Sequence, residues 1–302
     1  MLSRFAIYFD EVARAGSIRK ASERLNVAAS AIDRQILKME GQLGTALFER
    51  RPQGLRLTAA GEVMIGVVRN WRRELRNAES QLDALKGLRR GEINLAVVEG
   101  SAAFVTRSLA AFSRVYPGIV YHLRMAMSAQ VTDLVLAGDA DFGICFNPPA
   151  RHDIRVERTL VYQLGAVVLP DHPIATQTEI ALSACADHAL IGPIEGNALR
   201  EILDRAWATS VGTPPRFVAT ASTISLIKSL VLNGVGMGFL TPIDVAEEVA
   251  TGRLCLVPIG SPAFALSALS LITASGRPPS TAASLLIQHL GAAMAAEPGR
   301  VI

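Results

Sequence analysis

A heptad repeat near position 75 constrains this chain more than any other feature. Apolar residues recur there at alternating steps of four and three: Met64, Val68, Trp71, Leu75, Ala78, Leu82 and Leu85. The repeat predicts one amphipathic helix from Ala59 to Lys86, about 42 Å long at about 1.5 Å per residue. The segment before it is too short to cover such a stripe, and the simplest partner is a second copy of the chain.

The sequence therefore predicts a homodimer with a helical seam. The residues expected in that seam are Val68, Trp71, Leu75, Leu82 and Leu85. The alternative is a helix that lies on the C-terminal part of its own chain. Gly87 and Gly91 flank Arg89 and Arg90, and mark an expected hinge after the helix.

Charge is divided unevenly along the chain. Residues 1–91 hold 17 Lys and Arg against 10 Asp and Glu, a net charge of +7, whereas residues 92–302 carry a net charge of −4. A basic first third joined to a mildly acidic remainder indicates that only the first part meets a polyanion. Aromatic residues make up only 5% of the chain, which disfavours recognition of single strands by base stacking. Double-stranded DNA is the expected partner.

Three short helices are predicted before residue 45, at 3–15, 18–25 and 30–43. The tight connection at 26–28 makes the last two a helix–turn–helix, whose second helix enters the major groove of DNA. The polar side of that helix supplies the candidate DNA contacts Ser30, Asp33, Arg34, Gln35 and Lys38. Arg34 can pair with guanine and Gln35 with adenine, while Lys38 suits a phosphate. The alternative is an ordinary solvated helix face.

A β-hairpin is predicted between residues 47 and 58, because two short alternating runs flank a Pro-Gln-Gly turn. Arg50, Arg51 and Arg56 would lie along it as a basic wing against the sugar-phosphate backbone. The alternative is a solvated hairpin with ordinary surface arginines.

Six short stretches carry a family resemblance in their order and spacing. They are VARAGS at 12–17, ASERL at 21–25, RQI at 34–36, EGQLG at 40–44, LFER at 47–50 and LTAAG at 57–61. Through them, the segment from Phe9 to Gly61 resembles the DNA-binding domain of LysR-type transcriptional regulators. The chain departs from that family at Ala28 and Asp33, where hydroxyl residues are common. A carboxylate at position 33 can accept a hydrogen bond from cytosine.

The remaining two-thirds is more loosely similar to the effector domain of the same family. That resemblance implies a periplasmic-binding-protein-like fold, in which two α/β subdomains joined by two crossovers enclose a small-molecule effector. It also implies a homotetramer built from two dimers, and it leaves RNA polymerase as a candidate partner. The whole chain is thus expected to be an α/β multi-domain protein: a winged helix–turn–helix at 1–58, a linker helix and hinge at 59–91, and an effector-binding domain at 92–302. Its subdomain I is expected at about 92–161 and 266–302, and subdomain II at about 162–265.

Strands and helices alternate after residue 92, which predicts a mostly parallel sheet with ligands beyond the carboxyl ends of its strands. The candidate effector contacts are Ser101, Ser128, Phe146, Asn147, Gly192 and Thr223. Two of these, Ser101 and Ser128, lie at predicted helix starts, where a hydroxyl and free amides can receive a carboxylate. Simple helix capping is the alternative for each of them.

Other classes of function are disfavoured. The sequence contains no nucleophile elbow, zinc-protease motif or Walker loop, so neither an enzyme nor a cofactor is expected. The sequence contains no apolar run long enough to span a bilayer and does not begin like a leader peptide, which predicts a cytoplasmic protein. The three cysteines, Cys145, Cys185 and Cys255, show no metal-ligand spacing. A thiol-based redox sensor that uses Cys145 is the alternative, although uncharged neighbours favour an inert thiol.

Overall fold

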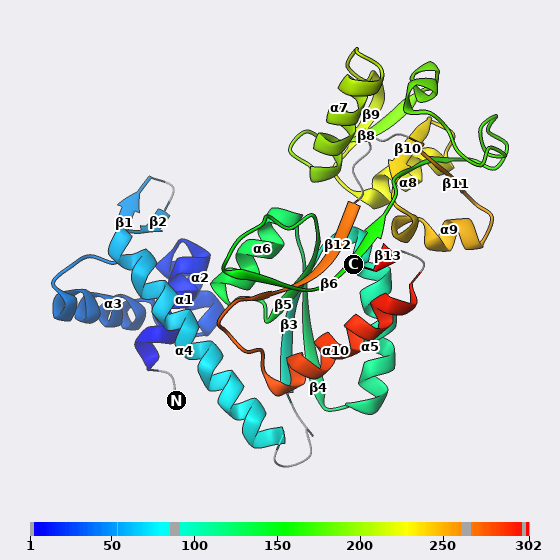
Figure 1. Cartoon of the computed structure of the whole chain (residues 1–302). Helices are drawn as coiled ribbons and strands as arrows, with labels where there is room; N and C mark the ends of the chain where they lie inside the picture. Colours follow the sequence, from blue (N-terminus) through cyan, green and yellow to red (C-terminus); the bar gives the residue numbers. More distant parts are fainter. Residues whose placement is uncertain (1–2, 53, 85–90, 261–266, 298–299, 302) are drawn as a thin grey trace. The chain divides into compact units, whose positions relative to one another are not determined.

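The computed structural model describes residues 3–52, 54–84, 91–260, 267–297 and 300–301. The chain divides into two compact units, residues 1–88 with 137–139 and residues 89–136 with 140–302. The described elements of the first, N-terminal unit are α1 (Arg4–Ala15), α2 (Ile18–Leu25), α3 (Ala29–Leu43), β1 (Phe48–Arg51), β2 (Gly54–Leu57) and α4 (Ala59–Ala84) (Figure 1). They form the predicted winged helix–turn–helix followed by a long helix.

Local signals set the ends of the first helices. Helix α1 ends at Gly16, whose φ of 64° lies in the left-handed region that glycine adopts without strain. The Ser17 hydroxyl accepts a hydrogen bond from the amide of Lys20 and caps α2. Asn26, with a φ of 52°, ends α2 and makes the tight turn before α3. Ala28 precedes the first residue of α3 and supplies no side-chain cap, which forgoes about 1 kcal/mol.

Two clusters of buried side chains hold the N-terminal unit together. One joins α1, α2 and α3 through Val12, Ala21, Ile32 and Ile36. The other joins α1, the hairpin and α4, and its buried members are Phe5, Ala6, Phe9, Leu47, Ile65 and Val68. The helical spacing of Ile32, Ile36, Met39 and Leu43 predicts the buried face of α3. Ile32 and Ile36 are buried as predicted, whereas Leu43 at the end of the helix is exposed.

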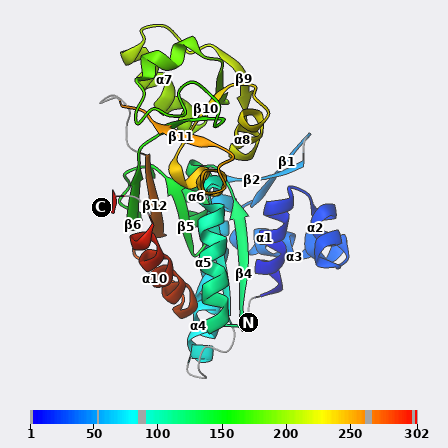
Figure 2. The same cartoon turned by 90° about the vertical axis from the view of Figure 1, so that its right-hand side faces the viewer.

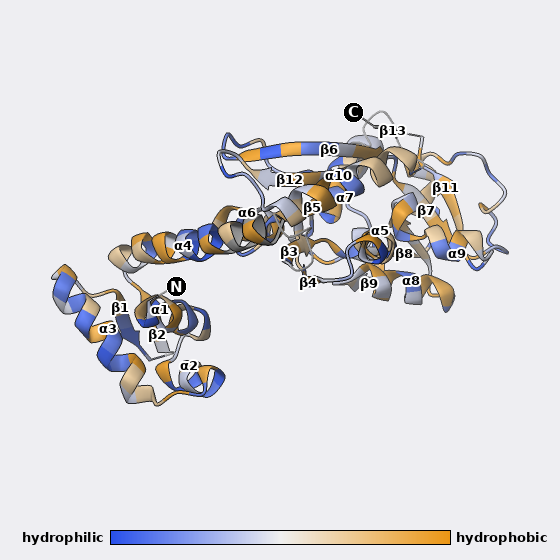
Figure 3. Cartoon of the chain, turned by 90° about the horizontal axis from the view of Figure 1, so that it is seen from below, coloured by the Kyte–Doolittle hydropathy of each residue, from blue (hydrophilic) through white to orange (hydrophobic). Residues whose placement is uncertain are grey.

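The long helix is confirmed from its first residue, Ala59, to Ala84, and the predicted seam residue Leu85 lies outside the described residues. Placing Val68 in the dimer seam is wrong, because the first three turns of α4 complete the core and Val68 is buried there. The large apolar side chains that α4 exposes, with their exposed fractions, are Val63 (72%), Val67 (41%), Trp71 (53%) and Leu82 (59%). Apolar and polar residues alternate along α4 in Figure 3.

The C-terminal unit is larger and contains the remaining elements. They are β3 (Gly91–Val97), η1 (Glu99–Ser101), α5 (Ala102–Val115), β4 (Ile119–Met125), α6 (Ser128–Ala137), β5 (Phe142–Phe146), β6 (Ile154–Tyr162), β7 (Gly165–Val168), η2 (Leu182–Asp187), β8 (Leu190–Pro193), α7 (Ala198–Ser210), β9 (Phe217–Ala221), α8 (Ile224–Leu232), β10 (Met237–Leu240), η3 (Pro242–Asp244), α9 (Ala246–Ala250), β11 (Cys255–Pro258), β12 (Ser267–Ala274), α10 (Thr281–Ala296) and β13 (Arg300–Val301).

Two sheets organise this unit. A six-stranded sheet has the order β13-β6-β12-β5-β3-β4, and a five-stranded sheet has the order β11-β7-β10-β8-β9. The first sheet takes strands from both ends of the unit and the second takes strands from its middle. We call the two sheets and their helices subdomain I and subdomain II.

The expectation of a mostly parallel sheet is wrong for subdomain I. Strand β3 pairs in parallel with β4 and β5, but β12 pairs antiparallel with both β5 and β6. The reason is topological, because β6 leads out toward subdomain II and β12 returns from it in the opposite direction. Strand β6 is buried at Ile154 and again from Leu160 to Tyr162, with exposed or half-buried residues between them, and its segment was not predicted as a strand.

Helices cover both faces of each sheet. Helices α5 and α10 lie side by side against the six-stranded sheet (Figure 2). Helix α6 covers its other face, where a Cβ atom added at Gly143 would overlap Val131. In subdomain II, α7 packs on one face of the five-stranded sheet through Leu203 and Trp207, while α8 packs on the other through Ile227 and Val231. The loops that follow β3, β5 and β9 lie at the carboxyl ends of these strands, where functional side chains are expected.

Candidate DNA-binding and effector sites

The exposed side of α3 carries the predicted DNA contacts. Ser30, Arg34 and Lys38 follow one another at intervals of four residues, and all three side chains are exposed. Asp33 and Gln35 flank this row and are half-buried. Leu37 also lies on this side and is exposed, which sequence reasoning missed. A helical projection of α3 already places Leu37 between Asp33 and Arg34, and an exposed apolar side chain there suits a thymine methyl group.

The hairpin is attached to the helix–turn–helix at both of its ends. The Glu40 carboxylate accepts hydrogen bonds from the amides of Leu47 (2.7 Å) and Phe48 (3.2 Å). The amide of Leu55 donates to the carbonyl of Gly16 at 2.8 Å. Because these bonds tie the hairpin to the end of α3 and the turn after α1, the wing has a fixed position beside α3.

The three wing arginines are exposed but not equivalent. Side chains alternate between the two faces of a strand, so Arg50 lies on the face opposite Arg51. The register pairs Arg56 with Glu49, which places Arg56 on the Arg51 face. Arg51 forms an ion pair with Glu49 at 2.6 Å, so part of its charge is already balanced. Within the described part of the chain, no carboxylate pairs with Arg34, Lys38, Arg50 or Arg56.

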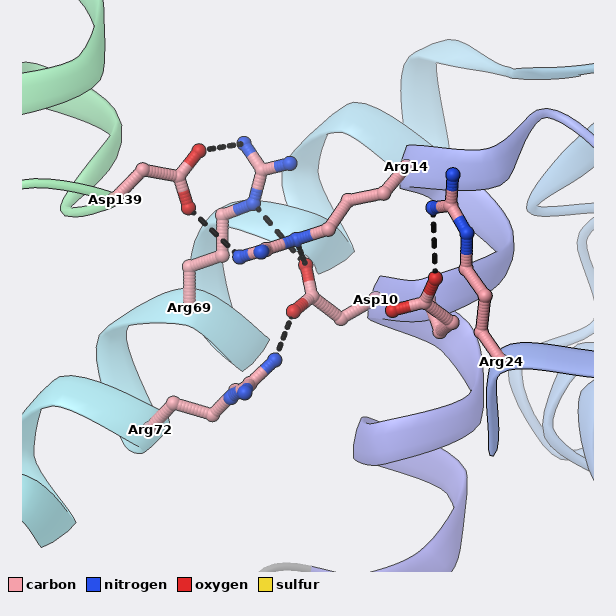
Figure 4. Close-up of polar contacts among 7 residues, drawn as sticks. Asp10, Arg14, Arg24, Arg69, Arg72 and Asp139 are labelled. Carbon is pink, nitrogen blue, oxygen red and sulfur yellow. Dashed lines mark hydrogen bonds and ion pairs between the residues drawn. The ribbon is translucent and has the colours of Figure 1, made fainter. Parts of the chain in front are cut away.

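Other arginines of the N-terminal unit serve its structure. The side chain of Asp10 on α1 is fully buried, and its carboxylate forms ion pairs with Arg14 (3.3 Å), Arg69 (3.4 Å) and Arg72 (Figure 4). Since Arg69 and Arg72 belong to α4, Asp10 fastens the long helix to α1. On the surface of the same unit, Arg24 forms an ion pair with Glu11 at 3.0 Å.

Two predicted effector contacts have structural roles instead. Ser101 ends the short 3₁₀ turn η1, which directs its fully buried hydroxyl back to donate to the carbonyl of Val98 at 2.9 Å. It therefore offers no donor to a ligand, and the prediction for Ser101 is wrong. Gly192 is buried in β8, and the ring of Phe217 fills the space where its Cβ would be. Gly192 is likewise part of the core.

The other four predicted contacts lie at loop edges of the two subdomains. Ser128 Oγ accepts a hydrogen bond from the amide of Phe146 at 3.2 Å, which joins the start of α6 to the end of β5. Asn147 has a φ of 47°, and its side-chain oxygen accepts from the amide of Ala268 at 2.9 Å. The Thr223 hydroxyl caps α8 by accepting from the amide of Leu226. These residues remain candidates for ligand contact.

Glu99 connects the two subdomains, and sequence reasoning did not single it out. Its carboxylate accepts hydrogen bonds from the amide of Ile224 (2.8 Å) and from the amide (2.9 Å) and hydroxyl (2.6 Å) of Ser225. Glu99 follows β3 in subdomain I, whereas Ile224 and Ser225 begin α8 in subdomain II. Its place directly after a predicted strand was the signal that could have found it.

Asp244 is the second carboxylate at this junction. Its Oδ2 accepts from the amide (2.8 Å) and hydroxyl (2.7 Å) of Thr241. Its Oδ1 is buried and has no hydrogen-bond partner within the described part of the chain. A Cβ atom added at Gly100 would overlap this oxygen, so Oδ1 faces the Gly100 backbone. Burial raises the pKa of Asp244 to about 6, against hydrogen bonds from Thr241 that lower it.

This pKa shift predicts a pH dependence of stability. Because the pKa is raised in the folded protein, the unfolded chain releases the proton first as pH rises, and folding loses stability between about pH 4 and pH 6. The full shift corresponds to roughly 3 kcal/mol. The stability difference between Asp244→Asn and the wild type should therefore shift in favour of the variant by up to about that amount as the pH rises from 4 to 7.5. Urea unfolding of both proteins at the two pH values measures the change, and an unchanged difference would contradict it.

Cys145 does not have the properties of a reactive thiol. It is fully buried in β5, and burial raises its pKa to about 11, although a hydrogen bond with Thr132 lowers it. A protonated, buried thiol is a poor nucleophile, which disfavours the redox-sensor alternative. Among the described residues, no cluster of His, Cys, Asp or Glu could hold a metal ion. None of the described helices is both long enough and apolar enough to cross a membrane.

A winged helix–turn–helix followed by an α/β unit of two sheets defines a DNA-binding regulator with a separate ligand-sensing domain. Family comparisons agree with this architecture. Residues 4–62 match the helix–turn–helix model of bacterial regulatory proteins of the lysR family, and residues 86–295 match the LysR substrate binding domain. The chain belongs to the LysR family of transcriptional regulators.

Individual relatives span nearly the whole chain. This chain is 26% identical over 251 residues to the RuBisCO operon transcriptional regulator of Allochromatium vinosum, and the match covers 83% of each sequence. A full-length OxyR variant from Pseudomonas aeruginosa has a similar fold, with a TM-score of 0.70 at 17% identity over 97% of this chain and 95% of that one. CbnR in complex with its target DNA has a TM-score of 0.65 at 20% identity, over 97% and 100% of the two chains.

Proposed function

We propose that α3 reads operator DNA in the major groove while the wing contacts the phosphate backbone. The residues assigned to this interface are Ser30, Asp33, Arg34, Gln35, Lys38, Arg50, Arg51 and Arg56. One observation carries the assignment: α3 and the hairpin hold exposed cations that have no carboxylate partner among the residues that the structure describes, whereas Arg14, Arg69 and Arg72 surround Asp10. Unpaired cations gain most from phosphate, since they release condensed counterions without first breaking an ion pair.

The regulator acts as a dimer held by α4. At about 100° per residue, Val63, Val67, Trp71 and Leu82 fall within about 100° of the helix circumference, next to the buried face that holds Ile65 and Val68. An exposed apolar stripe on a long helix fits a second copy of the same stripe about a two-fold axis. A tetramer made of two such dimers, and contact with RNA polymerase, extend this proposal.

The C-terminal unit senses a small molecule where subdomains I and II meet, and it works without catalysis. The candidate contacts there are Ser128, Phe146, Asn147 and Thr223, with Glu99 added from its hydrogen bonds to α8. If an effector binds one arrangement of the two subdomains more tightly than another, it changes the affinity of the protein for operator DNA. Such couplings typically amount to about 1–3 kcal/mol. Because its target is chromosomal DNA, we place the protein in the cytoplasm.

Replacing Arg34 by Ala tests the assignment of α3. We expect this variant to weaken binding to the DNA upstream of its own gene and also to lose discrimination at one base pair, by about ten- to a hundredfold, since a bidentate contact to guanine carries about 1–3 kcal/mol. Gel shifts against a set of single-base substitutions measure both effects. Lys38→Ala is the matched control, expected to weaken binding to all sequences alike.

If Arg34→Ala weakened binding to all DNA sequences alike, Arg34 would be assigned to a phosphate contact instead. Arg19→Ala serves as a second control, because Arg19 is exposed on α2 and paired with Glu23 at 3.4 Å. If Arg19→Ala lowered affinity as much as Arg34→Ala, the assignment of α3 as the reading helix would be wrong.

A further inference from the structure

The position that suits an anionic effector is already filled by a side chain of the protein. The first amides of a helix attract anions, because they point outward unpaired and the helix dipole is positive there. At the start of α8 these amides, on Ile224 and Ser225, donate to the Glu99 carboxylate at 2.8 and 2.9 Å, and the Ser225 hydroxyl donates at 2.6 Å. The anion bound by α8 is therefore the chain's own carboxylate, supplied by the opposite subdomain.

A second carboxylate stands behind this contact. Asp244 is only 7% exposed, and its Oδ1 has no hydrogen-bond partner among the described residues. Its position against Gly100 places it next to the backbone that carries Glu99. Lys228 on α8 forms an ion pair with Glu248 at 2.9 Å, so its charge is already balanced. A further anion at the junction would be repelled by both carboxylates, and more strongly by Asp244 because it is buried.

We propose that Glu99 is a built-in ligand of the amides at the start of α8, and that it makes this regulator select effectors without negative charge. An anion can bind to the amides at the start of α8 only by displacing the Glu99 carboxylate from its three hydrogen bonds. Uncharged and cationic small molecules face no such competition. The inference rests on the proposed role of the C-terminal unit in effector binding, and it names the chemical class that this unit accepts.

The test removes the internal carboxylate and offers a simple anion in its place. Inorganic phosphate is titrated calorimetrically into the full-length protein at pH 7 and constant ionic strength. Glu99→Ala frees the two amides and the Ser225 hydroxyl, so we expect it to bind phosphate at least about tenfold more tightly than the wild type. The double variant Glu99→Ala with Ser225→Ala loses one of these donors and should bind phosphate less tightly than Glu99→Ala alone.

A charge-matched control separates site occupancy from net charge. Glu247→Ala removes one exposed carboxylate from α9, in the subdomain that contains α8, and should leave phosphate binding at the wild-type level. If Glu247→Ala gains as much as Glu99→Ala, or if the wild type binds phosphate as tightly as Glu99→Ala, the proposal is overturned. Should Glu99→Ala fail to fold, Glu99→Ser replaces it, because a serine hydroxyl is too short to reach α8.

Operator gel shifts of the same proteins keep this proposal distinct from the proposed function. If Glu99→Ala binds operator DNA but gains no phosphate affinity, the role of Glu99 is refuted while the DNA-binding function stands. If the wild-type protein itself fails to bind operator DNA, the proposed function is refuted, and a phosphate gain in Glu99→Ala would still establish that Glu99 fills an anion site.

Discussion

Replacing Asp10 by Asn should lower the free energy of unfolding of the N-terminal unit by about 3 kcal/mol. Removing one partner of a buried ion pair typically costs about 3–5 kcal/mol. The carboxylate is fully buried, and its removal leaves Arg72 without its counter-charge and leaves Arg14 and Arg69 with Asp139 alone, at 2.9 and 3.9 Å. The side chains of the three arginines are 23–37% exposed, so water relieves part of the repulsion. We therefore expect a value near the lower end of the range.

The same substitution should also weaken DNA binding. Asp10 joins α1 to α4 (Figure 4), so its loss frees the long helix from the helix–turn–helix that it orients. Hydrogen exchange of backbone amides in α1 and α4 measures the local loss of stability, and gel shifts measure the affinity for DNA.

Glu11→Gln is the matched control, because Glu11 is the next residue on α1 and its ion pair with Arg24 lies at the surface. Surface ion pairs contribute about 0–1 kcal/mol, so this variant should exchange its amides almost as slowly as the wild type. Equal effects of the two substitutions would contradict the structural role of Asp10.

Replacing Trp71 by Glu should convert the regulator into a monomer and reduce its affinity for operator DNA by at least about a hundredfold. Trp71 is half exposed in the middle of the apolar stripe of α4, where a charge in a helix–helix seam cannot reach water. Joining two DNA-binding domains raises their effective affinity by about 10²–10⁴ without any new contact. Sedimentation measures the oligomeric state and gel shifts measure the affinity.

Val115→Glu controls for the loss of an exposed apolar side chain elsewhere. Val115 ends α5 in the C-terminal unit and is 68% exposed, so this variant should remain dimeric and bind DNA normally. If Trp71→Glu remains a dimer at the same concentration, the interface lies on another surface of the protein.

Sequence reasoning worked best where the signals are local. The tight connection at 26–28, the alternation of the hairpin and the apolar spacing of Ile32 and Ile36 are each set within a few residues, and the boundaries of α1 to α4 follow from such signals. Family resemblance supplied what local signals could not, namely the division of the C-terminal unit into two subdomains.

Long-range contacts explain what the sequence did not reveal. Val68 fits the heptad repeat, yet it is buried, because Phe5 and Phe9 on α1 reach the same face of α4. Arg69 and Arg72 follow Asp10 by 59 and 62 residues, so no local pattern distinguishes them from the DNA-binding arginines. Glu99 likewise finds its partners 125 residues later, on α8. Each of these roles depends on which elements meet in space.

The pairing of β6 with β12 limits how the two subdomains can move. The chain leaves subdomain I after Tyr162 and returns at Ser267, and these two residues lie opposite each other in the ladder. Two adjacent points of attachment permit rotation about the line that joins them and resist twisting about any other axis. Opening and closing of the C-terminal unit thus has a single easy degree of freedom, so chemically different effectors must all express their effect through the same angle.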